Sequence, residues 1–328
     1  MPFRSHLTLC FVAILVIVYF VSSAEVTGQV QAQENAAISE LDEIYKPVKW
    51  RCIGPFRGGR SVCASGIPGS PQTYLMGTTG GGVWKTVDAG HHWHNVSDGY
   101  FKTGSVGAIA VSESDPNVIY VGMGEHAPRG VMTSHGDGVY KSDDGGKTWR
   151  HLGLAETQHI ARIVIHPKNP DVVYVAAQGA LHAPSKARGI YQSIDGGHTW
   201  KQIHFVNSLT GCSELSMDMS NPRVLYATMW EHQRKPWIVV SGGEGSGVYK
   251  TSDAGETWKQ IHEGLPEEKG KMAIAVSRSN PDKIYALVES DSNLEKGGLF
   301  VSSNGGTKWT RISEDLSLIH ISEPTRRY

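Results

Sequence analysis

The sequence has few cysteines, little net charge and little continuous apolar sequence. It has 328 residues but only four cysteines, and loss of Cys10 with an N-terminal leader would leave Cys52, Cys63 and Cys212. An odd number of cysteines permits at most one disulfide within the chain, which excludes a small disulfide-stabilised scaffold. The formal net charge of −1 argues against the electrostatic surface that nucleic-acid-binding proteins use, and we predict no nucleic-acid partner.

Motifs for metal, nucleotide or serine-based chemistry are also missing. Among the 15 histidines, His92 and His94 fall on one strand face, but no cysteine or carboxylate stands at a metal-site spacing from them. We therefore predict no metal and no cofactor. The run Gly80-Gly81-Gly82 is not followed by a helical pattern, so a tight turn is favoured over a phosphate-binding loop. No nucleophile-elbow serine is present.

An apolar run lies close to the N-terminus. Leu7–Val21 follows Arg4 and His6 and precedes Ser22-Ser23-Ala24. This order is typical of a secretory signal, and the run is short for the ~20 residues of a membrane span. We expect a signal peptide over 1–24 and a linker over 25–48. The protein would then be secreted, periplasmic or in the cell envelope, with transient membrane association through the signal; an uncleaved anchor is the alternative.

A nine-residue motif, which we call the box, recurs five times with a period of about 50 residues. Its copies are residues 85–93, 141–149, 192–200, 250–258 and 301–309. An Asp or Asn and one or two glycines make a tight turn between antiparallel strands, and the closing Trp begins the outgoing strand and buries its ring. The turn and the core explain the recurring positions, so we assign these residues a structural role: Asp88, Trp93, Asp144, Trp149, Asp195, Trp200, Asp253, Trp258, Asn304 and Trp309.

Four short strands, A to D, accompany each box. A repeated unit of this size predicts an all-β protein, a β-propeller of four-stranded blades, over 49–315. A β-sandwich is the rival, but it requires no repeating turn. The expected blades are 49–100, 101–154, 155–208, 209–265 and 266–315. We expect the five blades to belong to a larger ring, cut short in its fifth repeat, because 316–328 resembles translated adapter sequence and forms an artefactual tail.

The loops between strands B and C differ in every unit, whereas the A–B turns are short and alike. We expect the A–B and box turns on one face of the propeller and the B–C loops on the other. Variable loops on a rigid frame commonly hold the binding site. We therefore place the working face at the B–C loops, among them 125–138, 179–189, 231–247 and 290–298.

Two B–C loops begin with Glu followed by His. The units are aligned on Tyr74, Tyr120, Tyr174, Tyr226 and Tyr285, and five residues on stand Thr79, Glu125, Gly179, Glu231 and Ser290. The pairs Glu125-His126 and Glu231-His232 could transfer protons or hold a polar ligand, or form solvated salt bridges. Because the second and fourth blades are not adjacent, the two Glu should lie farther apart than the ~5–10 Å of a glycosidase pair, unless the loops fold inward.

Tryptophan and arginine supply the remaining candidates. Trp230 and Trp237 bracket Arg234 in the longest loop, where exposed rings could stack on sugars or peptide side chains, or pack onto the blade. Arg57 and Arg60 flank two glycines and could clamp a carboxylate or belong to a bend. No clear arginine triad of the sialidase kind is present, although Arg57, Arg60 and Arg129 could be argued.

The boxes match the Asp-box, or bacterial neuraminidase repeat, and the chain resembles the sortilin-type N-terminal propeller. The segments 50–60, 108–125 and 138–149 are also similar to exported bacterial proteins described as glycosyl hydrolase-like, which are related to xyloglucanases. The resemblance covers about 48–313 and implies polysaccharide as substrate or ligand, or a peptide in a sortilin-like binding or scaffold propeller.

The resemblance also tests catalysis. Xyloglucanases have a catalytic Asp in a Thr-Asp-Ile-Gly-Gly stretch of the first blade, and the matching stretch here is Thr78-Thr79-Gly80-Gly81. Thr79 therefore stands where the acid is expected, and a hydroxyl does not serve as acid or base near neutral pH. No catalytic residue is assigned, enzyme activity is left open, and the sequence does not indicate an oligomeric state.

Overall fold

The computed structural model describes residues 60–128, 133–290 and 296–313. The predicted signal, linker and tail, together with Arg57, Arg129 and Cys52, lie outside these residues. Within the described chain Cys63 and Cys212 are free thiols. The described residues also contain no helix that combines the length and apolar character needed to cross a membrane.

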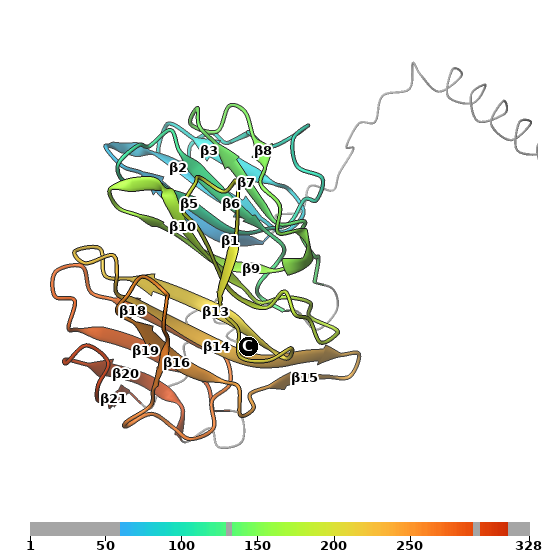
Figure 1. The fold of residues 1–328 in the computed structure, drawn as a ribbon. Helices are drawn as coiled ribbons and strands as arrows, with labels where there is room; N and C mark the ends of the chain where they lie inside the picture. Colours follow the sequence, from blue (N-terminus) through green and yellow to red (C-terminus); the bar gives the residue numbers. More distant parts are fainter. Residues whose placement is uncertain (1–59, 129–132, 291–295, 314–328) are drawn as a thin grey trace, which may run out of the picture. The chain divides into compact units, whose positions relative to one another are not determined.

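Five antiparallel sheets follow one another along the chain (Figure 1). Sheet one contains β1 (Ser61–Ile67), β2 (Ser70–Thr78), β3 (Val83–Thr86) and β4 (His94–Asn95). Sheet two contains β5 (Val106–Val111), β6 (Ile119–Met123), β7 (Val139–Ser142) and β8 (Arg150–His151). Sheet three follows the 3₁₀ turn η1 (Ala155–Thr157) and contains β9 (Ile160–His166), β10 (Asn169–Ala177), β11 (Gly189–Ser193) and β12 (Lys201–His204). Sheet four contains β13 (Thr210–Met217), β14 (Leu225–Lys235), β15 (Ile238–Ser241), β16 (Gly247–Thr251) and β17 (Lys259–Ile261). Sheet five contains β18 (Met272–Val276), β19 (Ile284–Val288), β20 (Gly298–Ser302) and β21 (Thr310–Ser313).

Each sheet is a meander whose strands pair in chain order, except that β15 pairs only with β14. This architecture confirms the all-β propeller. The four-strand unit recurs because each box supplies the same turn between the third and fourth strands. In sheet two, the Asp144 carboxylate accepts the Ser142 hydroxyl at 2.7 Å and the backbone N–H of Thr148 at 2.9 Å. The box acid therefore acts in the turn.

The box turns and the A–B turns share one face, as predicted. In every sheet a backbone N–H of the box turn donates to a carbonyl in the A–B turn or in the first residues of strand B of the same sheet. The five bonds are Ala89 to Gln72, Gly145 to Asn117, Gly196 to Asp171, Ala254 to Arg223 and Gly305 to Asp282. We call this side the box face. The B–C loops leave the opposite ends of the strands, and we call that side the B–C face.

Neighbouring sheets pack face to face around their first strands. β5 packs against β1 and β9, and β13 packs against β9 and β18. An apolar core fills each of these four interfaces. Tryptophans of the boxes reach the preceding sheet: Trp149 donates to the Val96 carbonyl and Trp200 to the Leu152 carbonyl, both at 2.8 Å. Stacking of one sheet on the next is thus the source of the core.

A polar residue at the first position of the box also links each of the first four sheets to the next. Lys85 donates to the Gly145 carbonyl at 2.8 Å, Lys141 lies 3.7 Å from the Asp171 carboxylate, and Lys250 donates to the Gly305 carbonyl at 2.8 Å. In sheet three Gln192 donates to the Ala254 carbonyl at 3.3 Å. Since these contacts recur, we call this position the latch; Val301 occupies it in sheet five.

The alignment of the first unit on Tyr74 is wrong by one residue. In sheets two to four the strand-B tyrosine pairs with the latch residue, as Tyr120 does with Lys141. In sheet one Leu75 pairs with the latch Lys85, and Tyr74 pairs with Thr86. The shift turns Tyr74 toward solvent, with 41% of its surface exposed, whereas Tyr120 is fully buried. The structural equivalent of Glu125 in sheet one is therefore Gly80.

Candidate functional site

Strand A begins and strand B ends at the B–C face, and backbone hydrogen bonds hold these ends together. In four sheets the N–H of the residue that follows strand B donates to the carbonyl of the residue that precedes strand A. The pairs are Thr79 to Arg60, Gly124 to Ser105, Gln178 to His159 and Glu289 to Lys271. This repeated geometry brings polar side chains of several sheets toward the first strands, around which the sheets are arranged.

The first pair of this cluster joins sheets one and two. Arg60 Nη1 lies 3.0 Å from Glu125 Oε1, and the Glu125 carboxylate is fully buried while Arg60 is partly exposed. The adjacent His126 ring contributes a buried Nδ1 that has no hydrogen-bond partner within the described residues. Burial, reinforced by Lys271, lowers the pKa of His126 to about 4. Its imidazole is therefore neutral near pH 7, and the Glu125 carboxylate is matched by arginine.

Lys271, at the start of β18, is the centre of a second group. Its Nζ lies 5.3 Å above the Trp230 ring and donates to the His126 carbonyl at 3.3 Å. Burial lowers the pKa of Lys271, an effect opposed by Glu289 and Glu214. The Glu289 carboxylate in turn accepts the Ser241 hydroxyl at 2.9 Å and the Lys271 N–H at 2.8 Å. Sheets two, four and five thus meet at one ammonium group.

Trp230 is buried, so the prediction that its ring is exposed is wrong and the packing alternative holds. Only 2% of its surface is exposed, its Nε1 donates to Ser241 Oγ at 3.0 Å, and it stacks on His232 at 4.1 Å between ring centroids. Strand β14 continues past the expected strand end, which places Trp230 inside the sheet rather than in a loop. Burial and Arg188 lower the pKa of His232 to about 3.

Arg188 is the residue that the sequence did not single out. Its side chain is fully buried. Its guanidinium donates to the carbonyls of Ala180 at 2.5 Å, Leu209 at 2.6 Å and His232 at 3.2 Å. These carbonyls come from a B–C loop, from the connection between sheets three and four, and from β14. A lone Arg in a polar loop gives no sequence signal for such a role, because the carbonyls it gathers are distant in sequence.

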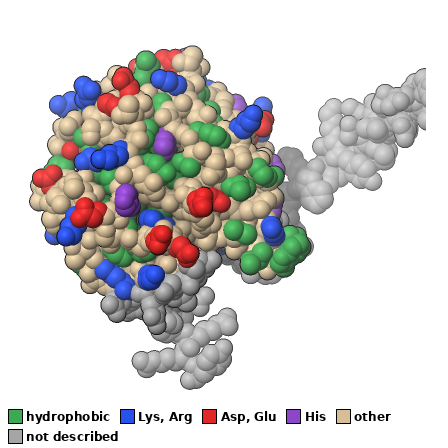
Figure 2. Space-filling view, turned by 60° about the horizontal axis from the view of Figure 1, so that its bottom comes forward, with side chains coloured by type: hydrophobic (Ala, Val, Ile, Leu, Met, Phe, Trp, Pro, Cys, Tyr) green, Lys and Arg blue, Asp and Glu red, His purple; other side chains and the backbone are tan. Residues whose placement is uncertain are grey.

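The segment 231–247, expected as a loop, begins with a projecting hairpin of β14 and β15 (Figure 1). Trp237 stands at its turn with 80% of its surface exposed, and Ile238 and Val240 follow with 50% and 38%. Figure 2 shows hydrophobic side chains gathered at the right-hand edge, the side on which the hairpin projects in Figure 1. Arg234 is half-buried in the same hairpin, and its N–H donates to the Leu181 carbonyl at 2.9 Å.

A pocket of about 710 Å3 opens at the base of this hairpin. Residues 241–244 form one wall and residues 267–270 the other. Glu231 lies behind the first wall, where its carboxylate accepts the Gly245 N–H at 3.0 Å. A Cβ at Gly270 would lie 2.7 Å from Glu289 Oε2. The glycine-rich walls therefore bring a ligand-sized space next to two glutamates of the B–C face, and Trp237 belongs to the hairpin that rises from it.

Catalytic and metal chemistry find less support. The Glu-His pairs predicted from the sequence are not carboxylate–imidazole couples: Glu125 pairs with Arg60, Glu231 binds a backbone N–H, and the His232 ring contacts Arg188. Residues 60–128, 133–290 and 296–313 contain no group of three or more His, Cys, Asp or Glu side chains that could hold a metal ion. The described part of the B–C face thus combines imidazoles that are neutral near pH 7, those of His126 and His232, with the ion pair of Arg60 and Glu125.

Comparison with known proteins finds distant sequence similarity to xyloglucanases. No family model matches the chain. It is 19% identical over 232 residues to an oligoxyloglucan-reducing end-specific xyloglucanase of Emericella nidulans. This match covers 63% of this chain and 26% of that protein. It is 21% identical over 230 residues to a Paenibacillus xyloglucanase. This second match covers 70% of this chain and 19% of that protein. The chain thus matches about a quarter or less of the length of these two relatives.

A solved structure supports the fold. The crystal structure of an ancestral GH74 enzyme superposes with a TM-score of 0.59 and 19% identity, over 80% of this chain and 34% of that one. At this identity the likeness establishes the propeller fold alone. Together, the sequence and structure comparisons define a propeller similar to glycoside hydrolases.

Proposed function

We propose that the chain is part of an exported, glycoside hydrolase-like propeller that holds polysaccharide on its B–C face. The observation that carries this proposal is Trp237, which exposes 80% of its surface on the hairpin above the pocket of about 710 Å3. An exposed aromatic face suits stacking on a sugar ring, and pockets of ~300–1,000 Å3 accommodate small ligands. The xyloglucanase relatives make a plant β-glucan such as xyloglucan the first ligand to test.

Within the described residues we assign binding, not hydrolysis, to this face. Thr79 occupies the position where the resemblance implies an acid, and its N–H is engaged by the Arg60 carbonyl. Glycoside hydrolysis normally requires two carboxyl groups flanking the bond that is cleaved. The alternative, a sortilin-like peptide-binding propeller, is favoured by the exposed Ile238 and Val240 beside Trp237.

The test is calorimetric titration of the purified protein with xyloglucan oligosaccharides, with Trp237→Ala and Ile194→Ala as matched variants. Ile194 is 69% exposed but lies in a box turn on the opposite face. A stacking contribution of ~0.5–1.5 kcal/mol predicts that Trp237→Ala weakens binding up to about tenfold. Ile194→Ala should bind like the parent. Equal affinity of Trp237→Ala and the parent would remove the hairpin from the site, and no binding of any glycan would favour the peptide alternative.

A reducing-end assay on the same polysaccharide separates binding from hydrolysis. We expect retained binding with no release of reducing ends. Release of reducing ends by this chain would contradict the assignment of a non-catalytic role. Hydrolysis would then require a catalytic acid at a position other than residue 79.

A further inference from the structure

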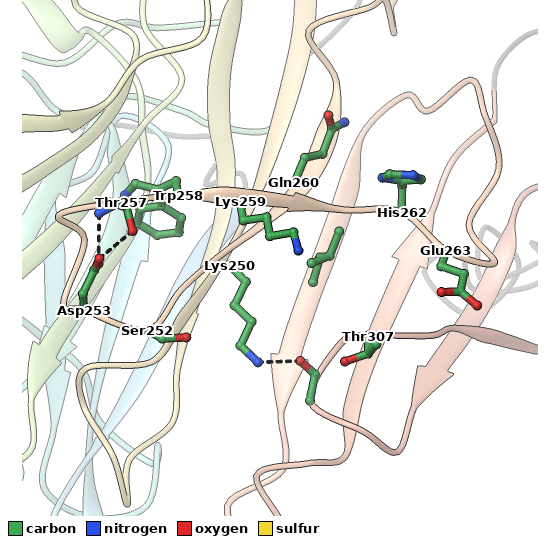
Figure 3. A pocket seen from close by; sticks show the side chains of 12 residues that line it. Lys250, Ser252, Asp253, Thr257, Trp258, Lys259, Gln260, His262, Glu263 and Thr307 are labelled. Carbon is green, nitrogen blue, oxygen red and sulfur yellow. Dashed lines mark hydrogen bonds between the residues drawn. The ribbon is translucent and has the colours of Figure 1, made fainter.

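The box face has a pocket of its own at the junction of sheets four and five. It measures about 510 Å3 and is lined by β16, by β17 and the residues after it, and by the box turn of sheet five. Figure 3 shows Lys250 and Lys259 pointing into the space between β17 and sheet five, with His262 and Glu263 at its other end. Two ammonium groups directed into one space repel each other unless a negative group lies between them.

Among the described residues Lys250 and Lys259 form no ion pair with a carboxylate, although Asp253 and Glu263 also line the pocket. The Asp253 carboxylate is committed to its own turn, where it accepts the Thr251 and Thr257 hydroxyls. These hydrogen bonds hold the pKa of Asp253 well below its usual range. Within the described residues no carboxylate lies within ion-pair distance of Lys250, whose Nζ donates to the Gly305 carbonyl at 2.8 Å. Burial lowers the pKa of Lys250, an effect opposed by Asp282.

The same latch position in sheet two has a different environment. There Lys141 Nζ lies 3.0 Å from Asp143 and 3.7 Å from Asp171. In sheet four the residue equivalent to Asp143 is Ser252, whereas Asp282 stands where Asp171 does, so one of the two carboxylates near the latch lysine is missing. The pocket opens at this latch, with Ser252 among its lining residues.

The sheet before it gives a second contrast. The tetrapeptide Lys-Gln-Ile-His follows the box Trp in both sheets three and four. In sheet three its histidine, His204, is enclosed by Tyr249 and Trp258 at ring distances of 4.7 and 5.3 Å. In sheet four His262 is exposed and lines the pocket, as does Thr307 from the facing box. The histidine of the same tetrapeptide is therefore packed between sheets three and four, but is exposed at the pocket between sheets four and five.

We propose that this pocket is a binding site for an oxyanion, a phosphate or sulfate group, held by Lys250 and Lys259. Charge-assisted hydrogen bonds from the two ammonium groups would supply the attraction, with His262 as a neighbouring donor. The group could be the free ion or a substituent on a larger glycan. The site lies on the box face, so it is independent of the glycan-binding function proposed for the B–C face.

The experiment is titration of the protein with sodium sulfate and sodium phosphate by calorimetry at constant ionic strength, with sodium chloride as reference. Lys259→Gln removes an exposed charge and should weaken binding up to about fivefold. Ser252→Asp introduces the carboxylate that Lys141 already has and should weaken binding at least as much. Lys201→Gln, the same substitution in sheet three, is the matched control and should change nothing.

Each outcome is decisive. Saturable binding that is weakened by Lys259→Gln and Ser252→Asp, but not by Lys201→Gln, supports the site. Absence of saturable binding, or equal weakening in Lys201→Gln, overturns it, because the effect would then be general surface attraction. Glucose 6-sulfate and glucose, titrated in parallel, separate the sources: a sulfated sugar that binds more tightly than sulfate identifies a substituent as the ligand, and equal affinity identifies the free ion.

Discussion

Replacement of Arg188 by Met should strongly destabilise the protein. The side chain is fully buried, and its guanidinium satisfies the carbonyls of Ala180, Leu209 and His232. Methionine has a similar length but no donor, so these buried carbonyls would lose their partner. Hydrogen bonds to charged groups contribute ~1.5–3 kcal/mol each. The variant loses two short hydrogen bonds, and this loss is partly offset because the guanidinium no longer has to be desolvated. We therefore expect the free energy of unfolding to fall by about 3–5 kcal/mol.

A loss of this size is a large fraction of the ~5–15 kcal/mol that stabilises a typical domain. The measurement is urea denaturation followed by tryptophan fluorescence, with the loss read from the transition midpoint at constant slope. Arg223→Met is the control, because Arg223 is exposed and its substitution should change stability by no more than ~0.5 kcal/mol. If Arg188→Met lost less than about 1 kcal/mol, the idea that this guanidinium organises the loops of sheets three and four would be refuted.

Two further predictions concern acid sensitivity. Hydrogen bonds from Thr199 and Ser193 hold the pKa of Asp195 well below its usual range, so its contribution to stability is present above pH ~4 and is lost as the pH falls further. Asp195→Asn should therefore flatten the dependence of stability on pH below 4, whereas Asp98→Asn, at an exposed position, should not. Burial lowers the pKa of His204 to about 4, so the unfolded chain binds the proton first and stability falls between pH ~6.5 and 4. In that window His204→Gln should reduce the slope of the unfolding midpoint against pH, and an unchanged slope, or the same change in His198→Gln, would contradict the burial argument.

The propeller could be predicted because its signal is repeated. Each box places an acid, glycines and a Trp at fixed spacing, and Asp144 illustrates that these residues act locally, through bonds within four positions. The division into two faces followed from the length and variety of the loops. The same turn motif occurs five times, so a deviation in one copy does not obscure the pattern that predicts the fold.

The candidate site could be predicted only in part, because its partners are distant in sequence. Arg60 and Glu125 were both selected, but their pairing depends on two sheets lying side by side. Trp230 was misread because β14 runs on into the hairpin. Leu75, and not Tyr74, takes the structural place of the later tyrosines, since sheet one shifts its register by one residue. The local sequence does not indicate which of these residues pair or become buried. Packing against the neighbouring sheets determines it.

Two contacts join sheet five to sheet two, so the five sheets are not held equally strongly. Arg278 on sheet five pairs with Glu113 on sheet two, and Lys271 on sheet five donates to the His126 carbonyl on sheet two. Sheets two to five therefore form a closed circuit of contacts, and breaking any one interface leaves the others to hold the parts together. The main strand contacts of sheet one with another sheet are those with sheet two. Neither of the two contacts between sheets two and five involves sheet one, so sheet one stands outside the circuit that they close.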